Sequence, residues 1–330
     1  MSDEPVVRTR NLTKLYGARR AVNGLELVVP RGSVYGLLGQ NGAGKSTTIR
    51  MLLGLTPPTA GEVLLFGRSL ARERLALLPR VGCLVDGPAF YPFLSGEKNL
   101  ELLGSLTKPV TRARVREVLE RIGLGVRGAD RYKGYSTGMR QRLGIAAALL
   151  HDPELVVLDE PVNGLDPPAV LLVRNLIRDL AAKEGKTVLV SSHLLHEVEL
   201  TCDRVAIVEQ GQLVAEGRVA DLLREAGGLV EVELAAGADG AKALSVARGV
   251  EGVATAEATP DGLRLVLSAP VEAAVNRALV TAGLDVRAFV PRKRSLEDLY
   301  YELAAKTGGG AGVAGAQLQK PPAPDVKGAA

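Results

Sequence analysis

Continuous apolar runs alternate with segments of helical spacing along the first part of the chain. The runs Val34–Leu38, Leu155–Leu158 and Thr187–Ser191 are the patterns expected of strands buried on both faces. Val6–Val29 has strand character broken by polar turns. Helices are predicted at Lys45–Leu53, Arg112–Ile122, Gly138–Leu150, Ala169–Lys183 and His193–Leu200. Strands alternating with helices predict an α/β fold with a largely parallel sheet.

A different order of elements begins near Leu222. The pattern there predicts strand, helix, strand, strand, helix and strand, a βαββαβ order typical of a small ferredoxin-like α+β domain. These segments are Leu229–Ala235, Ala241–Arg248, Gly252–Ala258, Leu263–Ser268, Val271–Ala282 and Asp285–Val290. The sequence Thr259-Pro260-Asp261-Gly262 predicts the turn between the middle strands. A last helix follows, with Ser295 and Asp298 spaced as a capping box.

These patterns predict three parts: a first domain at 1–223, a C-terminal domain at 224–306, and a disordered tail at 307–330 that is rich in Gly, Ala and Pro. The net charge of +4 is small for 330 residues, and no basic block is interleaved with aromatics. We therefore expect no nucleic-acid partner. Cys83 and Cys202 are far apart, which argues against a disulfide framework or a zinc site.

The strongest chemical signal is a glycine-rich loop between a predicted strand and a predicted helix. It matches G-x-x-x-x-G-K-[ST] through Gly39, Gln40, Asn41, Gly42, Ala43, Gly44, Lys45 and Ser46, and Thr47 follows directly. Glycines let backbone N–H groups point at phosphate oxygens, and the helix N-terminus adds a positive dipole end. Lys45 would contact the β- and γ-phosphates, and the Ser46 hydroxyl would bind Mg²⁺. A chance glycine-rich turn is disfavoured because motif and context agree, so ATP and Mg²⁺ are the expected cofactors.

Two carboxylates follow the buried strand Leu155–Leu158. Asp159 is suited to hold Mg²⁺ through water, and Glu160 is suited to act as a general base on the attacking water. An Asp-Glu pair alone is as often a solvated strand end. The phosphate loop favours the functional interpretation because it requires a metal-binding acid on a neighbouring strand.

Taken together, Val6–Leu223 resembles the nucleotide-binding domain of ATP-binding cassette (ABC) transporters, an α/β P-loop fold with a helical subdomain. The family's signature loop is similar to Tyr135-Ser136-Thr137-Gly138-Met139-Arg140-Gln141-Arg142. Ser136 and Gly138 match the common form L-S-G-G-Q, whereas Tyr135, Thr137 and Met139 depart from it. The resemblance implies that Ser136 and Gly138 hydrogen-bond the γ-phosphate of an ATP held by a second subunit.

The resemblance assigns further roles. Tyr16 resembles the aromatic that stacks on adenine, although an isolated Tyr is more often a packing residue. Asp166, in Gly164-Leu165-Asp166, resembles the loop that contacts the other subunit. His193 resembles the switch histidine at the γ-phosphate, although a lone His at a strand end is usually structural.

One loop departs from the family. Asp86 stands where the family usually has Gln, in the loop that senses the γ-phosphate and touches the membrane partner. The following Gly87–Pro92 resembles the bacitracin-export and lantibiotic-immunity branch, where that position is often Glu. Asp86 would bind Mg²⁺ but adds negative charge beside the phosphates. The alternative is a turn residue.

These expectations lead to a principal hypothesis, an export motor. Two copies, or one copy and a homologous subunit, would close around ATP and drive a separate transmembrane permease from the cytoplasmic face of the membrane. The cargo implied by the branch is a hydrophobic peptide or antibiotic. One alternative is a non-transport cassette ATPase of translation or DNA repair, which usually has two cassettes or a coiled-coil insertion. Another is a nucleotide-binding regulator without turnover, which Glu160 and His193 disfavour.

Overall fold

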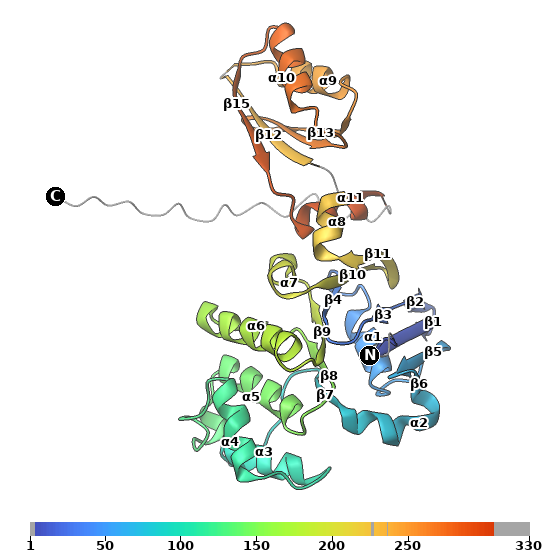
Figure 1. Ribbon diagram of the computed structural model, residues 1–330, viewed down its shortest axis with the longest axis vertical. Helices are drawn as coiled ribbons and strands as arrows, with labels where there is room; N and C mark the ends of the chain where they lie inside the picture. The colour runs from blue at the N-terminus through green and yellow to red at the C-terminus, as the bar shows by residue number, and fades with distance from the viewer. Residues whose placement is uncertain (1–3, 226–227, 236, 307–330) are drawn as a thin grey trace, which may run out of the picture.

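The computed structural model describes residues 4–225, 228–235 and 237–306. The tail expected to be disordered, 307–330, lies outside the described residues. The chain forms a lower body with the N-terminus and an upper body that contains most of the C-terminal elements (Figure 1).

A mostly parallel sheet runs through the lower body. Among the described residues it has six strands in the order β11-β10-β4-β9-β8-β7, and β11 alone is antiparallel to its neighbour. The strands are β4 Val34–Leu38, β7 Val81–Leu84, β8 Leu155–Asp159, β9 Thr187–Ser192, β10 Arg204–Glu209 and β11 Gln212–Arg218. We call it the central sheet. It confirms the expected α/β fold with a largely parallel sheet.

Side chains of the central sheet enter two separate cores. In β8, Val156 and Leu158 pack into one apolar cluster, and Leu155 and Val157 pack into the other. This alternation follows from the two-residue period of a strand, and burial on both faces explains why the sequence shows unbroken apolar runs.

The two faces of the central sheet are covered by different elements. One face packs on α1 Lys45–Leu52 and on an antiparallel sheet of β1 Val7–Tyr16, β2 Arg19–Leu25, β3 Val28–Val29, β5 Ala60–Leu65 and β6 Arg68–Ser69. This face is completed by α2 Leu70–Leu77 and the short η1 Leu78–Arg80. The other face packs on α3 Gly96–Ser105, α4 Arg112–Arg121, η2 Tyr132–Gly134, α5 Thr137–Leu149, α6 Pro167–Ala182 and α7 Leu195–Thr201.

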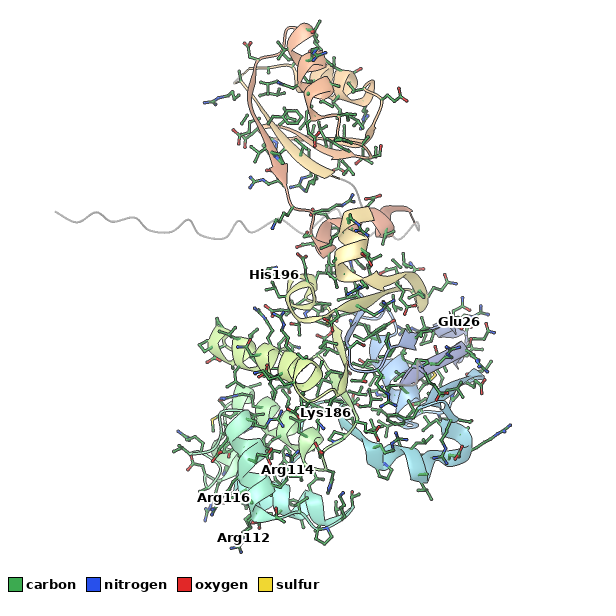
Figure 2. All side chains as sticks on the ribbon, in the orientation of Figure 1. Glu26, Arg112, Arg114, Arg116, Lys186 and His196 are labelled. Carbon is green, nitrogen blue, oxygen red and sulfur yellow. The ribbon has the colours of Figure 1, made fainter. Side chains whose placement is uncertain are left out.

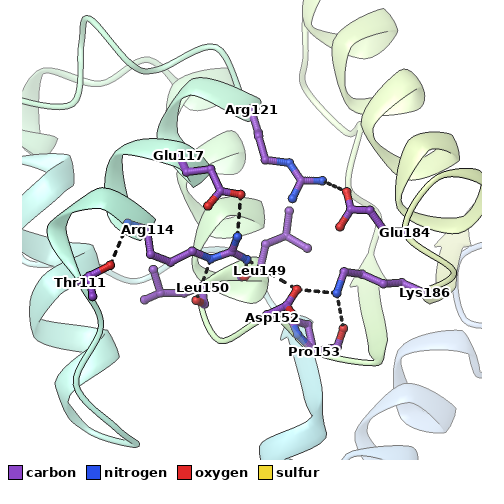
Figure 3. A network of polar contacts seen from close by, with 10 residues as sticks. All are labelled: Thr111, Arg114, Glu117, Arg121, Leu149, Leu150, Asp152, Pro153, Glu184 and Lys186. Atoms are coloured by element: carbon purple, nitrogen blue, oxygen red, sulfur yellow. Dashed lines mark hydrogen bonds and ion pairs between the residues drawn. The ribbon is translucent and has the colours of Figure 1, made fainter.

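A polar network fastens α4 to the end of α5 and to the start of β9 (Figure 3). The Arg114 guanidinium donates to the carbonyls of Leu149 at 2.6 Å and Leu150 at 3.2 Å. The Lys186 ammonium donates to Asp152 at 2.6 Å, which lowers the pKa of that carboxyl. Arg112, Arg114 and Arg116 all lie on α4, far from the upper body (Figure 2). The network links the helical layer to the turn that leads into β8.

The upper body has its own sheet and its own core. In the described residues the strand order is β13-β14-β12-β15, entirely antiparallel, with α9 and α10 packed beside it. The elements are β12 Gly228–Leu234, α9 Gly240–Arg248, β13 Val253–Thr259, β14 Gly262–Leu267, α10 Glu272–Thr281 and β15 Val286–Arg292. We call this the C-terminal sheet. Its βαββαβ order is the one expected from the sequence, and a separate apolar cluster fills it.

The chain enters the upper body through α8 Val219–Glu225 and leaves it through α11 Leu296–Lys306. Helix α11 packs against α7 and α8 of the lower body. The expected capping box forms, because Ser295 N donates to Asp298 Oδ2 at 2.9 Å and Asp298 N donates to Ser295 Oγ at 3.2 Å. The boundaries at 223 and 306 stay predictions. In the structure α11 shares the apolar cluster of the lower body.

Helix boundaries differ from expectation by one or two residues. For example, α5 begins at Thr137 instead of Gly138, because Ser136 is its N-cap and accepts from Met139 N at 3.2 Å. Helix α7 begins at Leu195, two residues after the expected start at His193. The hydrophobic pattern predicted no elements in the region of α2, β5 and α3.

Gly82 in β7 tests how closely α5 packs on the central sheet. A Cβ added there would lie 1.8 Å from the Ala148 carbonyl oxygen, so backbone would have to move. We expect Gly82→Ala to lower the free energy of unfolding by about 1–3 kcal/mol or more. The measurement is the urea unfolding midpoint. The control is Gly134→Ala, where a Cβ meets nothing within 4 Å and the change should be within about 0.5 kcal/mol. Equal midpoints for the two variants would contradict the packing.

Candidate active site

The glycine-rich loop joins the end of β4 to the start of α1, as the sequence predicts. A Cβ on Gly39 would lie 2.3 Å from the Val208 carbonyl oxygen, and one on Gly44 would lie 2.5 Å from the Ala21 carbonyl oxygen. Gly44 also has φ of +105°, a backbone conformation that favours glycine. Both glycines are thus required by the close approach of neighbouring backbone.

Lys45 lies under this loop with only 6% of its surface exposed. Its ammonium donates to the carbonyls of Gly39 at 2.6 Å and Gln40 at 3.2 Å. Burying a charge is costly unless it is hydrogen-bonded, and these carbonyls satisfy that need. The helix α1 begins after Gly44 without a side-chain cap. A helix start without a side-chain cap, next to a positive charge, favours binding of an anion such as phosphate.

The carboxylates at the end of β8 are held by residues of β9. Glu160 N donates to Ser191 Oγ at 3.0 Å, and the Ser191 hydroxyl donates to Asp159 Oδ1. Glu160 has φ of +48°, which turns the chain sharply after the strand. Because β8 and β9 are parallel neighbours, their carboxyl ends meet at one edge of the central sheet.

Glu160 connects the phosphate loop to the predicted switch histidine. Its Oε1 lies 3.6 Å from Lys45 Nζ, and its Oε2 lies 2.9 Å from His193 Nδ1. The carboxylate is therefore shared between a buried cation and an imidazole. A phosphate group that approached Lys45 would compete with Glu160 for the same charge.

A pocket lies beside the phosphate loop. Its lining in the described part of the chain is Tyr16, Arg19, Ala21, Gln40, Asn41, Gly42, Gly44, Lys45, Ser46, Thr47 and Glu160. Tyr16 is 47% exposed, and Lys14 Nζ lies 5.2 Å from its ring centroid. The pocket thus brings together the predicted aromatic, the loop and the predicted base. Arg19 was not predicted, and no motif marks it.

The predicted signature residues are not part of that pocket. Ser136 and Gly138 are absent from its described lining, and they lie at the start of α5, in the helical layer. Asp166 likewise caps another helix, because its carboxylate accepts from Ala169 N at 3.1 Å at the start of α6. Ser136 and Asp166 are both exposed. Any phosphate they contact must then come from outside this pocket.

Asp86 lies just after β7 and is paired with Arg50 of α1. The guanidinium of Arg50 donates to both carboxylate oxygens, at 2.6 and 3.2 Å, and this pairing raises the pKa of Arg50. Asp86 has φ of +60° and is exposed. The negative charge predicted at Asp86 is thus balanced by Arg50, a cation on the phosphate-loop helix.

Some polar residues of this region were not predicted. Ser191 joins Asp159 to Glu160, and Gln141 Nε2 donates to the Glu160 carbonyl at 3.2 Å, which connects α5 to the predicted base. Ser191 could have been suspected from its place two residues before His193. Gln141 and Arg50 could not, because their partners are distant in sequence.

The oxygen donors of this region suit ATP with Mg²⁺. Mg²⁺ prefers hard oxygen ligands, keeps several waters, and needs only one or two protein ligands beside the phosphates. Ser46 supplies a hydroxyl and Asp159 supplies a carboxylate oriented by Ser191. No cluster of three His, Cys, Asp or Glu side chains that could hold a metal occurs in the described residues. These residues suit a metal ion that is coordinated by the phosphates of ATP and by only one or two side chains of the protein.

The chain is similar to known proteins in sequence and in fold. A family model described as ABC transporter matches residues 22–163. The chain is 37% identical over 311 residues to the bacitracin transport ATP-binding protein of Enterococcus faecalis, covering 94% of this chain and 99% of that one. It is 39% identical over 302 residues to a daunorubicin resistance ATP-binding protein of Streptomyces coeruleorubidus, covering 88% and 93%. A solved dimeric ATP-binding cassette, in a post-hydrolysis state with ADP and Pi, matches with a TM-score of 0.60 and 25% identity, over 64% of this chain and 98% of that one.

Lys45 offers the direct test of the loop. We expect Lys45→Ala to weaken binding of Mg-ATP by roughly 30-fold or more, because removing one partner of a buried charge pair costs about 2–5 kcal/mol. The measurement is titration with a fluorescent ATP analogue. Circular dichroism and thermal unfolding without nucleotide control for folding. Unchanged affinity in the folded variant would refute the assignment of the loop.

Proposed function

The chain belongs to the ATP-binding proteins of ABC transporters, and from this premise we propose that it is the motor subunit of an exporter. Two nucleotide sites would form between two ATPase subunits, and closure of the pair would drive a separate membrane permease. The observation that carries the proposal is that Lys45 and Glu160 line one pocket and that His193 contacts Glu160.

Each of these residues has a chemical task in hydrolysis. Lys45 neutralises charge on the terminal phosphates, and Ser46 and Asp159 supply the oxygens that would hold Mg²⁺. Mg²⁺, when bound, supplies further charge neutralisation on the phosphate oxygens. Glu160 accepts a proton from the attacking water. His193 contacts Glu160 at 2.9 Å and fixes the orientation of that carboxylate.

The proposal of a pair of subunits rests on the signature residues. Ser136 presents an exposed hydroxyl at the N-terminus of α5, where the helix dipole also favours an anion. Since Ser136 and Gly138 lie outside the described lining of the pocket, a γ-phosphate brought by a second subunit is their natural ligand. The related cassette that was solved as a dimer supports this arrangement. The second subunit is either another copy or a homologous ATPase.

The direction of transport and the cargo are proposed from the relatives. Those compared above are a bacitracin transport protein and a daunorubicin resistance protein. We infer a hydrophobic peptide or antibiotic-like cargo moved outward. None of the described helices is long and apolar enough to cross a bilayer. From the family we propose that the permease is a different chain, with this subunit bound at the cytoplasmic face of the membrane.

Glu160→Gln tests both the base and the pairing. We expect ATP turnover to fall by about 100-fold or more, because the general base is lost, while ATP affinity stays within a few-fold. Blocked hydrolysis should trap the closed pair, so light scattering with Mg-ATP should report twice the monomer mass. Adding Lys45→Ala to the same chain should abolish that pairing. Wild-type turnover in Glu160→Gln would exclude Glu160 as the base.

Co-purification from native membranes separates the transport role from a role in translation or DNA repair. We expect the full chain to copurify with a polytopic membrane protein, and we expect that complex to survive nuclease treatment. The measurement is mass spectrometry of the purified complex. Ribosomal proteins or DNA in place of a membrane protein would contradict the proposal of an export motor.

A further inference from the structure

Helix α11 follows the C-terminal sheet but is embedded in the lower body. Leu296, Leu299 and Tyr300 belong to the apolar cluster that covers one face of the central sheet. Tyr300 is only 3% exposed. The view in Figure 1 agrees, since α11 lies next to α8 and above α7. The part of the chain that comes last is therefore packed against the nucleotide-binding body.

The Tyr300 hydroxyl makes a polar contact at the rear of the phosphate loop. It donates to Glu209 Oε2 at 2.6 Å, and the amide groups of Gln40 lie near enough to oppose part of the rise in its pKa. Burial and the neighbouring Glu209 raise the pKa of Tyr300, so the phenol keeps its proton and stays a donor at neutral pH. Gln40 is itself a residue of the phosphate loop and of the pocket lining.

Glu209 ends β10, and the turn that follows supports the phosphate loop from behind. Gly211 N donates to the Ala43 carbonyl at 2.9 Å, and Asn23 N donates to the Gly211 carbonyl at 2.8 Å. The Val208 carbonyl oxygen leaves no room for a side chain on Gly39. The β10–β11 turn is thus the rear wall of the loop, and Tyr300 is hydrogen-bonded to Glu209, where this wall begins.

The residue that this turn holds, Ala43, is bonded to a carbonyl that orients Lys45. Ala43 N donates to the Gln40 carbonyl at 3.1 Å, and the same carbonyl accepts from Lys45 Nζ at 3.2 Å. A shift of the Gln40 backbone would therefore move an acceptor that orients Lys45. The start of α11 also contacts α7, the helix that follows His193, because Leu296 N donates to Glu199 Oε2 at 2.9 Å.

We propose that Tyr300 is a positioning residue for the phosphate loop, and that through it the C-terminal sheet is coupled to the ATP site. Its hydroxyl holds Glu209 at the end of β10, and the turn that follows holds Ala43, whose N–H is bonded to the Gln40 carbonyl that orients Lys45. Tyr300 itself touches no phosphate. The proposal rests on the assignment of Gly39–Ser46 as the nucleotide loop, which Lys45→Ala examines separately.

The test compares two conservative variants of the full chain. Tyr300→Phe removes the hydroxyl and keeps the ring. Its neighbour Tyr301 is 43% exposed, so Tyr301→Phe is the matched control. We expect Tyr300→Phe to raise the Kd of Mg-ATP by roughly three- to tenfold, as expected when one hydrogen bond of a charge-assisted network is lost. Tyr301→Phe should leave Kd and KM within about twofold.

Hydrogen exchange separates positioning from packing. In the absence of nucleotide, a peptide covering residues 39–46 should exchange faster in Tyr300→Phe than in Tyr301→Phe. A residue that only packs would lower the melting temperature and leave both Kd and exchange in this peptide unchanged. That result would overturn the proposal.

A second variant removes the other end of the bond. Glu209→Gln should also raise the Kd of Mg-ATP. The double variant Tyr300→Phe/Glu209→Gln should have a Kd no higher than that of the weaker-binding single variant, because the two substitutions remove the same hydrogen bond. Strictly additive losses would contradict a shared role.

The Lys45→Ala variant separates this proposal from the assignment of the nucleotide loop. If Lys45→Ala binds ATP normally, the assignment of the loop is wrong. If Lys45→Ala fails to bind ATP while Tyr300→Phe binds it as wild type does, only the role proposed for Tyr300 is wrong.

Discussion

A buried ammonium, that of Lys45, sets the requirements for the rest of the nucleotide-binding body. A charge with so little exposure must be surrounded by acceptors, and here these are the carbonyls of its own loop and the carboxylate of Glu160. Those acceptors come from the ends of β4 and β8, and β9 supplies Ser191 and leads to His193. A parallel sheet is the architecture that brings several strand ends to one edge, which is why chemistry and topology agree in this fold.

The sequence was sufficient wherever the signal was local. The phosphate loop, the acidic end of β8, the capping box of α11 and the hairpin at Pro260 each need only neighbouring residues, and the structure has all of these features. Contacts between distant segments were not predictable. Arg50 and Asp86 are 36 positions apart, and Tyr300 and Glu209 are 91 apart. Nothing in either segment indicates its partner, because such pairs depend on how whole elements pack.

The signature loop shows a different limit. Its local structure is an ordinary capped helix start, with Ser136 accepting from Met139 N, and many helices begin in this way. The start of α5 differs from most helix starts in that Ser136 is exposed and lies outside the described lining of the pocket of its own chain. The helix dipole and the Ser136 hydroxyl are therefore available to a phosphate from elsewhere. Gln141, one turn further along α5, donates to the Glu160 carbonyl. A ligand bound at the start of α5 would therefore be connected through Gln141 to Glu160, the predicted general base.

The path of the chain explains why the C-terminal sheet can act on the lower body at all. A domain attached by one linker transmits little force, because the linker absorbs displacement. Here the chain leaves the lower body through α8 and returns to it through α11, and these two helices pack on each other. Arg294, buried just before α11, pairs with Glu302 within the returning segment and stiffens the point of re-entry. Motion of the C-terminal sheet must then pass through α11, whose buried face contacts α7 on one side and the rear wall of the phosphate loop on the other.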